Sequence, residues 1–305
     1  MNLIIDISGF GLGEKWGIGG SKQYLNNIKL ARKFSIPMAL MPQSFGPFNY
    51  EGDCGRQLIS EIKNVLSYPY KIFAREKQGY DILKNEFHLH NVEQSFDLVL
   101  QNKGVDYKNI FCENYSPKEY VVSTKRNVAI IPNAQCFRHG NKELNFHLYR
   151  EIIDELIKKD RNVYVIGHAS EDHELCVQIV NLFAKEEKVH LFEHDLSCLE
   201  YDLFIKQFDY IVCSRFHGIV HAYRNSIPCI VLGWAIKYQA LTKSVKQEKY
   251  AFDITDGLCA ERDILDVIKD MNENYGVNSK IIRDCVTEIQ TNNCFDQMQI
   301  GVNFN

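Results

Sequence analysis

Short apolar runs alternate with longer helical patterns along the first third of this chain. Runs rich in Ile, Leu and Met predict strands at 2–7 (NLIIDI), 36–41 (IPMALM) and 70–74 (YKIFA). The intervening and following segments predict helices at 21–34, 54–67 and 76–86, with Ser21 as the N-cap of the first helix. This β-α-β-α order is typical of a parallel sheet with helices on both faces.

The alternation stops at residues 101–126, which are polar and aperiodic, and then starts again. Further strands are predicted at 127–132, 162–167, 189–192, 209–213 and 228–233. Further helices are predicted at 144–159, 171–185, 199–207, 217–225 and 261–290, followed by a polar tail. We therefore expect an α/β chain with two Rossmann-like doubly wound domains facing a cleft, at 1–120 and 121–305.

Composition and charge are those of a soluble globular protein. The 305 residues are 45% hydrophobic and 24% charged, and the formal net charge is −4 without a long basic run. A nucleic-acid partner is therefore not expected. The start, MNLIIDISGFG, lacks a basic leader, and no apolar run approaches the ~20 residues of a membrane span. These features predict a cytoplasmic protein.

The ten cysteines form neither a metal-binding nor a disulfide pattern. No C-x-x-C occurs, and residues such as Cys176, Cys213 and Cys229 stand inside apolar runs. We interpret most of them as reduced, buried side chains. Neither a metal site nor a bound cofactor is expected.

Candidate ligand-binding residues follow the strands, because doubly wound proteins bind ligands beyond the carboxyl ends of their strands. The glycine-rich loop SGFGLGEKWGIGG follows the first strand, but Trp16 occupies a position at which G-x-G-x-x-G requires glycine. We therefore expect a ligand-contacting loop around Gly11 instead of a dinucleotide site, with a plain loop as the alternative. The next two strands are followed by Gln43 and Ser44, and by Arg75 with Glu76. A solvated helix start is the alternative for the last pair.

Two strands of the second half also end in polar residues. Asn133 and Arg138 follow the strand at 127–132, and His168, Glu171 and Asp172 follow the strand at 162–167. Ser170, Glu171 and Asp172 could instead cap the next helix. A histidine placed directly after Gly167 at a strand end favours a role in the site.

The segment IVCSRFHGIVHA, residues 211–222, contains the most informative candidates. After the apolar strand, Ser214 could cap a helix whose first turn holds Arg215 and His217. A helix N-terminus attracts anions, a guanidinium matches carboxylate or phosphate, and a histidine moves protons near neutral pH. The alternative is a buried arginine paired with an acid, beside a core histidine. His217 and His221 stand i,i+4 and could share a metal, but H-E-x-x-H is absent.

The last strong strand is followed by Trp234, Lys237 and Tyr238 in VLGWAIKY. An aromatic face beside a cation suits a sugar or a second anionic group. A core tryptophan with an exposed lysine is the alternative.

The stretch SRFHGIVHAYRNSIPCIVLGWAIKY resembles the C-terminal signature of the polysaccharide pyruvyl transferase family. The same family is matched, in the same order, by DISGFGLGEKWG, PQSFGP, FAREKQGYDIL with Asp97, IIPNAQCF and IGHASEDHE. The resemblance covers residues 1 to about 245. It implies a GT-B-like pair of domains and phosphoenolpyruvate as donor substrate. The acceptor would be a sugar of a surface polysaccharide or of its lipid-linked precursor, handled near the glycan-assembly machinery.

The resemblance also implies roles for individual residues. Arg215 and His217 match the donor-binding motif, so Arg215 would clamp an anionic group and His217 would act as general acid or assist phosphate departure. From its position alone, and not from the resemblance, His168 completes the expected catalytic set, since it or Glu171 could take a proton from the acceptor. Further substrate contacts are expected from Arg138, Asn133, Glu171, Ser214, Trp234, Lys237, Tyr238, Gln43, Ser44, Arg75 and Gly11.

One departure from the family leaves alternatives open. Family members usually begin with another βα unit carrying an Asn/Gly-Asp loop, and this chain starts close to the second unit. We therefore keep two rival functions. One is a GT-B glycosyltransferase that uses a nucleotide sugar, and the other is a non-catalytic shortened relative that binds glycans.

Overall fold

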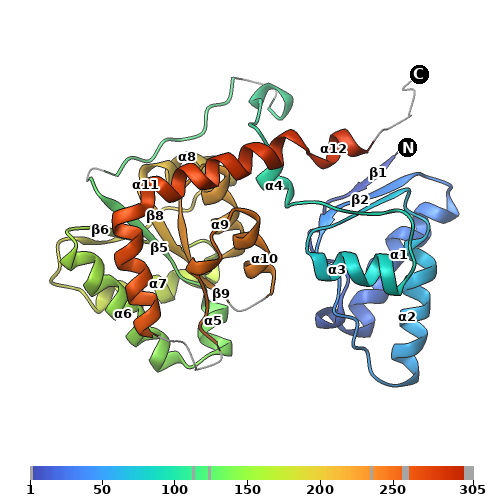
Figure 1. Ribbon diagram of the computed structural model, residues 1–305, viewed down its shortest axis with the longest axis horizontal. Coiled ribbons are helices and arrows are strands. Elements are labelled where there is room, and N and C mark those ends of the chain that lie inside the picture. The colour runs from blue at the N-terminus through green and yellow to red at the C-terminus, as the bar shows by residue number, and fades with distance from the viewer. Residues whose placement is uncertain (1–2, 112–113, 123–124, 234–235, 256–260, 299–305) are drawn as a thin grey trace. The chain divides into compact units, whose positions relative to one another are not determined.

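The computed structural model describes residues 3–111, 114–122, 125–233, 236–255 and 261–298 (Figure 1). By their internal contacts these residues form two compact units. The first unit falls within 1–101 and 289–305, and the second within 102–288. That the ranges 1–120 and 121–305 are the folding domains stays a prediction, and so does the cleft between them.

The first unit is built on a four-stranded parallel sheet in the order β1-β2-β3-β4. Its strands are β1 (Ile4–Asp6), β2 (Met38–Gln43), β3 (Lys71–Ala74) and β4 (Val92–Gln94). Its helices are α1 (Gly17–Lys33), α2 (Gly52–Leu66), α3 (Lys77–Asp81), which continues as a π-helical turn at Ile82–Glu86, and α4 (Leu98–Gln101). The sequence predicted the first three strands and missed β4, because Val-Glu-Gln contains a single apolar residue.

Both faces of this sheet are covered, by different parts of the chain. Alternate residues of a strand face opposite sides, so Met38 and Leu40 of β2 join the core with α1 and α2, whereas Ala39 and Met41 face the other way. On that second face they pack with Phe73 and with two residues at the end of the described chain, Cys294 and Met298, which come from α12 (Cys294–Gln297) and the position after it. The segment expected to be a polar tail is therefore part of the core.

The helix α1 begins earlier than the sequence predicted. It starts at Gly17, and Ser21 is fully buried inside it, so Ser21 is not the N-cap. The Ser21 hydroxyl lies 3.3 Å from the carbonyl oxygen of Gly13 and 2.6 Å from the Tyr50 hydroxyl. The glycines of the first turn are poor helix formers, which hides the true start.

The second unit contains a six-stranded parallel sheet in the order β10-β9-β8-β5-β6-β7. Its strands are β5 (Asn127–Ile131), β6 (Asn162–Ile166), β7 (Val189–Phe192), β8 (Tyr210–Cys213), β9 (Cys229–Gly233) and β10 (Ala251–Asp253). The chain runs outward from β5 to β7 and then crosses back to β8 on the other side of β5. The carboxyl ends of β5 and β8 thus flank a topological switch point, where doubly wound sheets bind ligands.

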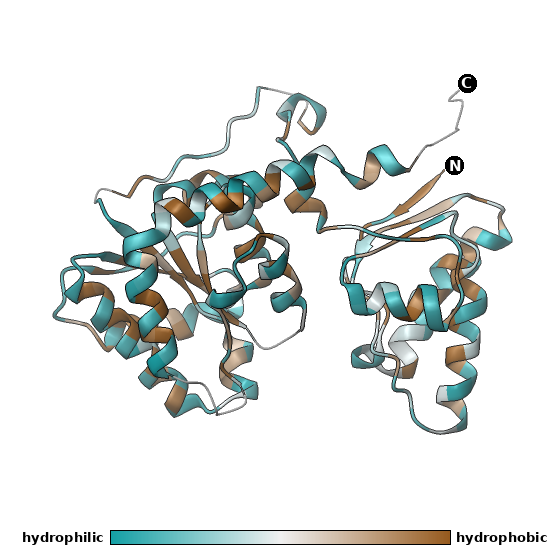
Figure 2. Cartoon of the chain, viewed as in Figure 1, coloured by the Kyte–Doolittle hydropathy of each residue, from teal (hydrophilic) through white to brown (hydrophobic). Residues whose placement is uncertain are grey.

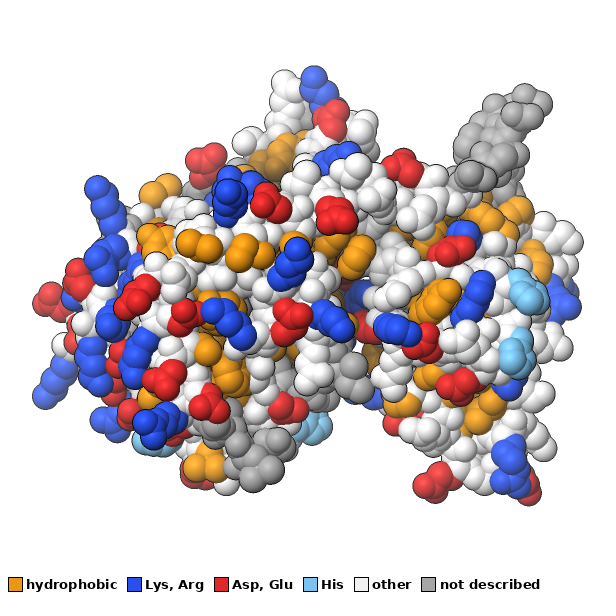
Figure 3. Space-filling model, in the orientation of Figure 1, with side chains coloured by type: hydrophobic (Ala, Val, Ile, Leu, Met, Phe, Trp, Pro, Cys, Tyr) orange, Lys and Arg blue, Asp and Glu red, His pale blue; other side chains and the backbone are white. Residues whose placement is uncertain are grey.

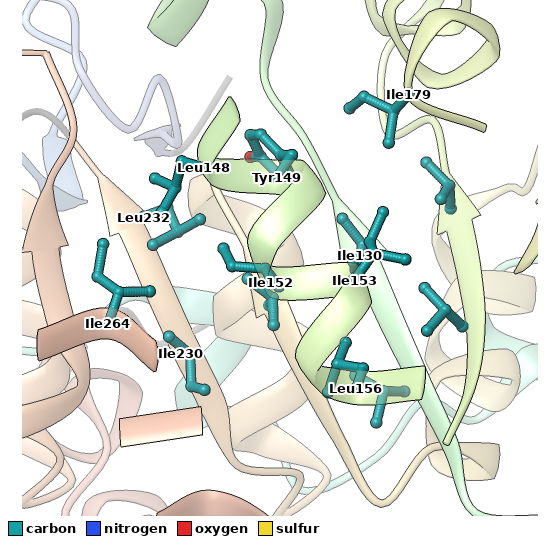
Figure 4. Packing of buried hydrophobic residues seen from close by; sticks show 14 of the residues in the cluster. Ile130, Leu148, Tyr149, Ile152, Ile153, Leu156, Ile179, Ile230, Leu232 and Ile264 are labelled. Carbon is teal, nitrogen blue, oxygen red and sulfur yellow. The ribbon is translucent and has the colours of Figure 1, made fainter. Parts of the chain in front are cut away.

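The helices of the second unit pack on this sheet through apolar stripes. They are α5 (Ala134–His139), α6 (Lys142–Lys158), α7 (His173–Asn181), α8 (Cys198–Phe204), α9 (Phe216–Arg224), α10 (Ile236–Ser244) and α11 (Glu261–Thr291). Figure 4 shows Leu148, Ile152 and Leu156 of α6 in the buried cluster with Ile130 of β5 and Ile230 of β9. Each such side chain stabilises the fold by roughly 1.5–3 kcal/mol. The sequence did not predict α5, α10 or β10.

Polar residues cover the outer surfaces of both units. Figure 2 shows hydrophobic residues concentrated on the strands and on the sides of helices that face them. In Figure 3, Lys and Arg side chains are interspersed with Asp and Glu on the face in view. Across the described ranges, no helix combines the length and hydrophobicity needed to cross a bilayer. The eight described cysteines are free thiols, and six of them are buried.

Candidate functional site at the switch point

The switch-point site is formed by residues that follow β5, β6 and β8 in the second unit. We use this name for Asn133, Gln135, Arg138, His168, Glu171, Asp172, Ser214, Arg215 and His217. At its centre, β8 ends at Cys213 and α9 begins at Phe216, so Arg215 stands at the helix N-cap position in an extended conformation. No side chain caps this helix, and Ser214, which the sequence favoured as the cap, has a different partner.

The guanidinium of Arg215 is fixed from one side by Asp172. Arg215 Nε donates to Asp172 Oδ2 at 2.8 Å, and Nη2 donates to Oδ1 at 2.5 Å. Asp172 is fully buried and also accepts hydrogen bonds from the backbone N–H groups of Ala134 (3.0 Å) and Ala169 (3.1 Å). A buried carboxylate is tolerated when N–H donors and a cation surround it in this way. The pairing leaves Arg215 Nη1 without an acceptor among the described residues.

Glu171, the neighbour of Asp172, joins Arg215 to Arg138. Its Oε1 accepts from Arg215 Nη2 at 2.6 Å and its Oε2 accepts from Arg138 Nη1 at 2.9 Å. Gln135 Nε2 donates to both oxygens, at 3.3 and 3.1 Å. The hydrogen bond from Arg215, with further help from Gln135 and Arg138, lowers the pKa of Glu171 to about 2. Such a carboxylate is a poor general base at neutral pH.

Asn133, Ser214 and Tyr238 hold the loop that carries Arg215. Asn133 caps α5 by accepting from the Gln135 N–H at 2.9 Å, and its Nδ2 donates to the Ser214 carbonyl oxygen at 3.1 Å. The Tyr238 hydroxyl donates to the same carbonyl at 2.9 Å. The Ser214 hydroxyl is buried against the Tyr149 hydroxyl at 2.9 Å. The polar side-chain atoms of these predicted substrate contacts are therefore engaged with the protein.

The three histidines of this region have different surroundings. His217 is exposed on the first turn of α9, with its ring centroid 5.6 Å from that of Phe216. His168 is partly buried against Tyr201, and burial, helped by the positive charge of Arg215, lowers its pKa to about 4. His221 is buried and its Nδ1 lies 3.0 Å from Asp202 Oδ1. His221 is thus committed to Asp202, and no cluster of three or more metal-ligating groups occurs within the described ranges.

Lys237 brings another cation close to the start of α9. Its Nζ lies 4.9 Å from the ring centroid of Phe216 and 5.6 Å from that of Tyr238. Cation–π contacts of this kind hold a lysine side chain in a defined position. Trp234, the remaining candidate of this segment, lies outside the described residues.

The candidates of the first unit form a separate buried network at the carboxyl ends of β2, β3 and β4. Arg75 donates to Glu76 (2.9 Å), Asp97 (2.9 Å) and the Ser44 hydroxyl (2.6 Å), and Ser44 in turn donates to Glu76 at 2.9 Å. Glu76 is buried, which contradicts its alternative interpretation as a solvated helix start. All three strand ends are therefore tied to one guanidinium.

Gln43 and Gly11 belong to the same part of the first unit. The buried Gln43 Nε2 donates to the Tyr24 hydroxyl at 2.9 Å. A Cβ added at Gly11 would lie 2.4 Å from ring atoms of Tyr24, so a larger residue would force that ring to move. The glycine is therefore required by local packing, whatever else the loop contacts.

Asp172 and Gln135 are the site residues that sequence reasoning missed. The sequence placed Asp172 after the strand at 162–167, with a helix cap as the alternative, and assigned it no role in the site; its carboxylate accepts from the Ala169 N–H while it also holds Arg215. No linear signal reveals the pairing, because 43 residues separate Asp172 from Arg215. Only the sheet order, in which β6 and β8 are the two neighbours of β5, brings the carboxyl ends of their strands together.

Two α/β units, each built on a parallel sheet, form a GT-B-like fold. Among solved structures, the chain resembles S. aureus MnaA in a co-structure with UDP (TM-score 0.58, 12% identity, 92% of this chain and 69% of that one). It also resembles UDP-GlcNAc 2-epimerases from Methanocaldococcus jannaschii (0.55, 13%, 92% and 76%) and from Neisseria meningitidis, bound to UDP-GlcNAc (0.54, 13%, 94% and 74%). At these identities the likeness concerns the fold alone.

The sequence itself matches a more specific group. The family model of polysaccharide pyruvyl transferase matches residues 1–235. The chain therefore belongs to the polysaccharide pyruvyl transferase family, as its motifs predicted. None of the curated proteins matches it in sequence.

Proposed function

We propose that this protein transfers a pyruvyl group from phosphoenolpyruvate to two hydroxyls of one sugar, forming a cyclic ketal and releasing phosphate. Family membership supports a transferase that acts on polysaccharides. The observation that carries the proposal further is the Arg215 guanidinium, which Asp172 holds on one edge while its Nη1 edge has no acceptor among the described residues. A planar cation presented in this way suits a carboxylate or a phosphate.

The proposed reaction begins at the enol carbons of the donor. His217, exposed next to Arg215, protonates the methylene carbon, which becomes the methyl group and leaves positive charge at the carbon that carries the phosphate oxygen. One sugar hydroxyl attacks that carbon and loses its proton. The C–O bond to phosphate then breaks and phosphate leaves with its electron pair. The second hydroxyl attacks the same carbon and loses its proton, which closes the ketal.

His168 is the better candidate than Glu171 for accepting the proton of the attacking hydroxyl. With its pKa lowered to about 4 by burial, His168 is neutral near pH 7 and offers a ring nitrogen. Glu171 is engaged by two arginines and an amide. Arg138 and Lys237 supply further positive charge for the donor.

The test is phosphate release from phosphoenolpyruvate with acceptor glycans, combined with mass analysis of the products. Wild-type protein should form a pyruvylated sugar and phosphate in equal amounts. His217→Ala should abolish both, whereas His147→Ala, which removes an exposed histidine of α6, should leave both unchanged. Retained turnover in His217→Ala would contradict the assigned role.

A nucleotide-sugar reaction is the second candidate, because the structural neighbours include proteins solved with UDP or UDP-GlcNAc. Thermal-shift measurements with phosphoenolpyruvate, UDP and UDP-GlcNAc separate the two. Stabilisation by phosphoenolpyruvate alone supports pyruvyl transfer, and stabilisation by the uridine compounds alone supports the rival.

A further inference from the structure

Glu171 occupies the position that an anionic ligand of the switch-point site would need. Its two carboxylate oxygens receive N–H groups from Arg215 at 2.6 Å, from Arg138 at 2.9 Å and from Gln135 at 3.1 and 3.3 Å. Two guanidinium groups and an amide converging on an anion form the arrangement by which proteins bind phosphate or carboxylate. Here the anion is part of the chain.

Glu171 differs from its neighbour Asp172 in how firmly it is held. Asp172 is completely buried and bound by two backbone N–H groups in addition to Arg215, so it cannot leave without breaking the loop. The side chain of Glu171 is 32% exposed, and among the described residues its hydrogen-bond partners are the side chains of Arg215, Arg138 and Gln135. Glu171 can therefore swing into solvent while Asp172 keeps the Arg215 guanidinium in place.

We propose that Glu171 is a built-in competitor for the donor and sets the selectivity of the switch-point site for highly charged anions. A ligand must displace the Glu171 carboxylate from Arg215 and Arg138. A phosphate group carries up to two negative charges and several acceptor oxygens. It therefore replaces the hydrogen bonds and the charge that Arg215 and Arg138 lose when Glu171 leaves, and it adds further attraction, whereas a monoanion adds none. This inference rests on the proposed function in that the competing donor is phosphoenolpyruvate.

The protonation state of Glu171 indicates that Arg215 and Arg138 are released when a ligand displaces the carboxylate, and not when the carboxylate is protonated. Because the hydrogen bond from Arg215 lowers its pKa to about 2, the carboxylate stays ionised at neutral and mildly acidic pH. Mild acid therefore does not release the two arginines. The competitor leaves when a stronger anion arrives.

The experiment compares anion binding to three forms of the whole chain by isothermal calorimetry. Glu171→Gln removes the charge and keeps the shape of the side chain. Glu174→Gln is the matched control, because Glu174 is an exposed acid in the first turn of the adjacent α7 and accepts a hydrogen bond from Gln178 instead of from an arginine. The probes are inorganic phosphate, phosphoenolpyruvate and the monoanion acetate.

The proposal expects Glu171→Gln to bind inorganic phosphate on the order of tenfold more tightly than wild type, and to gain measurable acetate binding. Glu174→Gln should stay within about twofold of wild type, since an exposed charge is screened. Unchanged, weaker or undetectable phosphate binding by Glu171→Gln, with a thermal unfolding midpoint like that of wild type, overturns the inference.

Failure of this inference can be told apart from failure of the proposed function. If Glu171→Gln binds phosphate more tightly but the wild type transfers no pyruvyl group, the competitor role of Glu171 is supported and the proposed reaction is rejected. Pyruvyl transfer by the wild type together with complete loss of turnover and no gain of binding in Glu171→Gln keeps the reaction. In that case Glu171 contacts the substrate directly.

Discussion

The carboxylate of Asp172 accepts hydrogen bonds from both Nε and Nη2 of Arg215, and Asp172 is the most deeply buried acid of the switch-point site. The first prediction follows from this pairing. Asp172→Asn should lower the free energy of unfolding by on the order of 3 kcal/mol, because it removes the buried one of the two carboxylates that pair with the partly buried Arg215. It should also weaken phosphate binding, since Arg215 loses the group that orients it. Urea unfolding and calorimetry measure the two effects.

The control for that variant is Asp160→Asn in the same unit. Asp160 pairs with Lys188 at 2.6 Å on the surface, where an ion pair contributes little. Its loss should leave both stability and phosphate binding unchanged. Equal effects of the two substitutions would contradict the special role of Asp172.

The buried network of Arg75 predicts a stability effect that leaves the switch-point site intact. Arg75→Ala strands Glu76 and Asp97 without their cation at the carboxyl ends of β3 and β4. The free energy of unfolding should fall by about 3–5 kcal/mol. Phosphate affinity at Arg215 should not change, because that site lies wholly in the second unit. Loss of phosphate binding by a folded Arg75→Ala protein would show that Arg75 itself contacts the ligand.

The lowered pKa of His168 predicts acid sensitivity of the fold. Burial lowers the pKa of His168 from 6.5 to about 4, so the unfolded chain takes up a proton between these pH values while the folded protein does not. Stability is therefore fully present above pH 6.5 and falls as pH drops towards 4, by at most about 1.4 kcal/mol per pH unit. His190, whose pKa burial also lowers, acts in the same direction.

Urea unfolding of His168→Gln at pH 7.5, 6.5, 5.5 and 4.5 measures this contribution. The variant should lose stability less steeply than wild type below pH 6.5. His147→Gln is the control for removing a histidine from the same unit. Identical slopes for wild type and His168→Gln would refute the buried, neutral state of His168.

The packing on the second face of the first sheet predicts that replacing Met298 strongly lowers the stability of the protein. Met298 is buried with Ala39, Met41 and Phe73, so Met298→Ala should cost about 2–5 kcal/mol of unfolding free energy. Phe295, only three positions earlier, is 55% exposed, and Phe295→Ala should change stability much less. The two variants truncate a buried and an exposed side chain of the same short segment, and equal costs would contradict the packing described.

The sequence predicted those parts of the molecule that depend on local pattern. The six-residue strand β2 is buried throughout, and its run of apolar residues predicted it. The three-residue strands β4 and β10 are too short to carry a pattern, and their pairing depends on neighbours far along the chain. Likewise, Arg215 and His217 were identifiable from their position after an apolar strand. Their partners were not, because Asp172 and Glu171 meet Arg215 only through the order of β5, β6 and β8.

The packing of Cys294 and Met298 on the first sheet has a consequence for folding during synthesis. A ribosome completes β1 to β4 well before it reaches this segment, and the whole second unit lies between them. At 5–20 residues per second, the face bearing Met41 and Phe73 stays uncovered for roughly 10–40 s. During synthesis the first unit therefore exposes an apolar surface of the kind that chaperones bind, and it is completed only by the last part of the described chain.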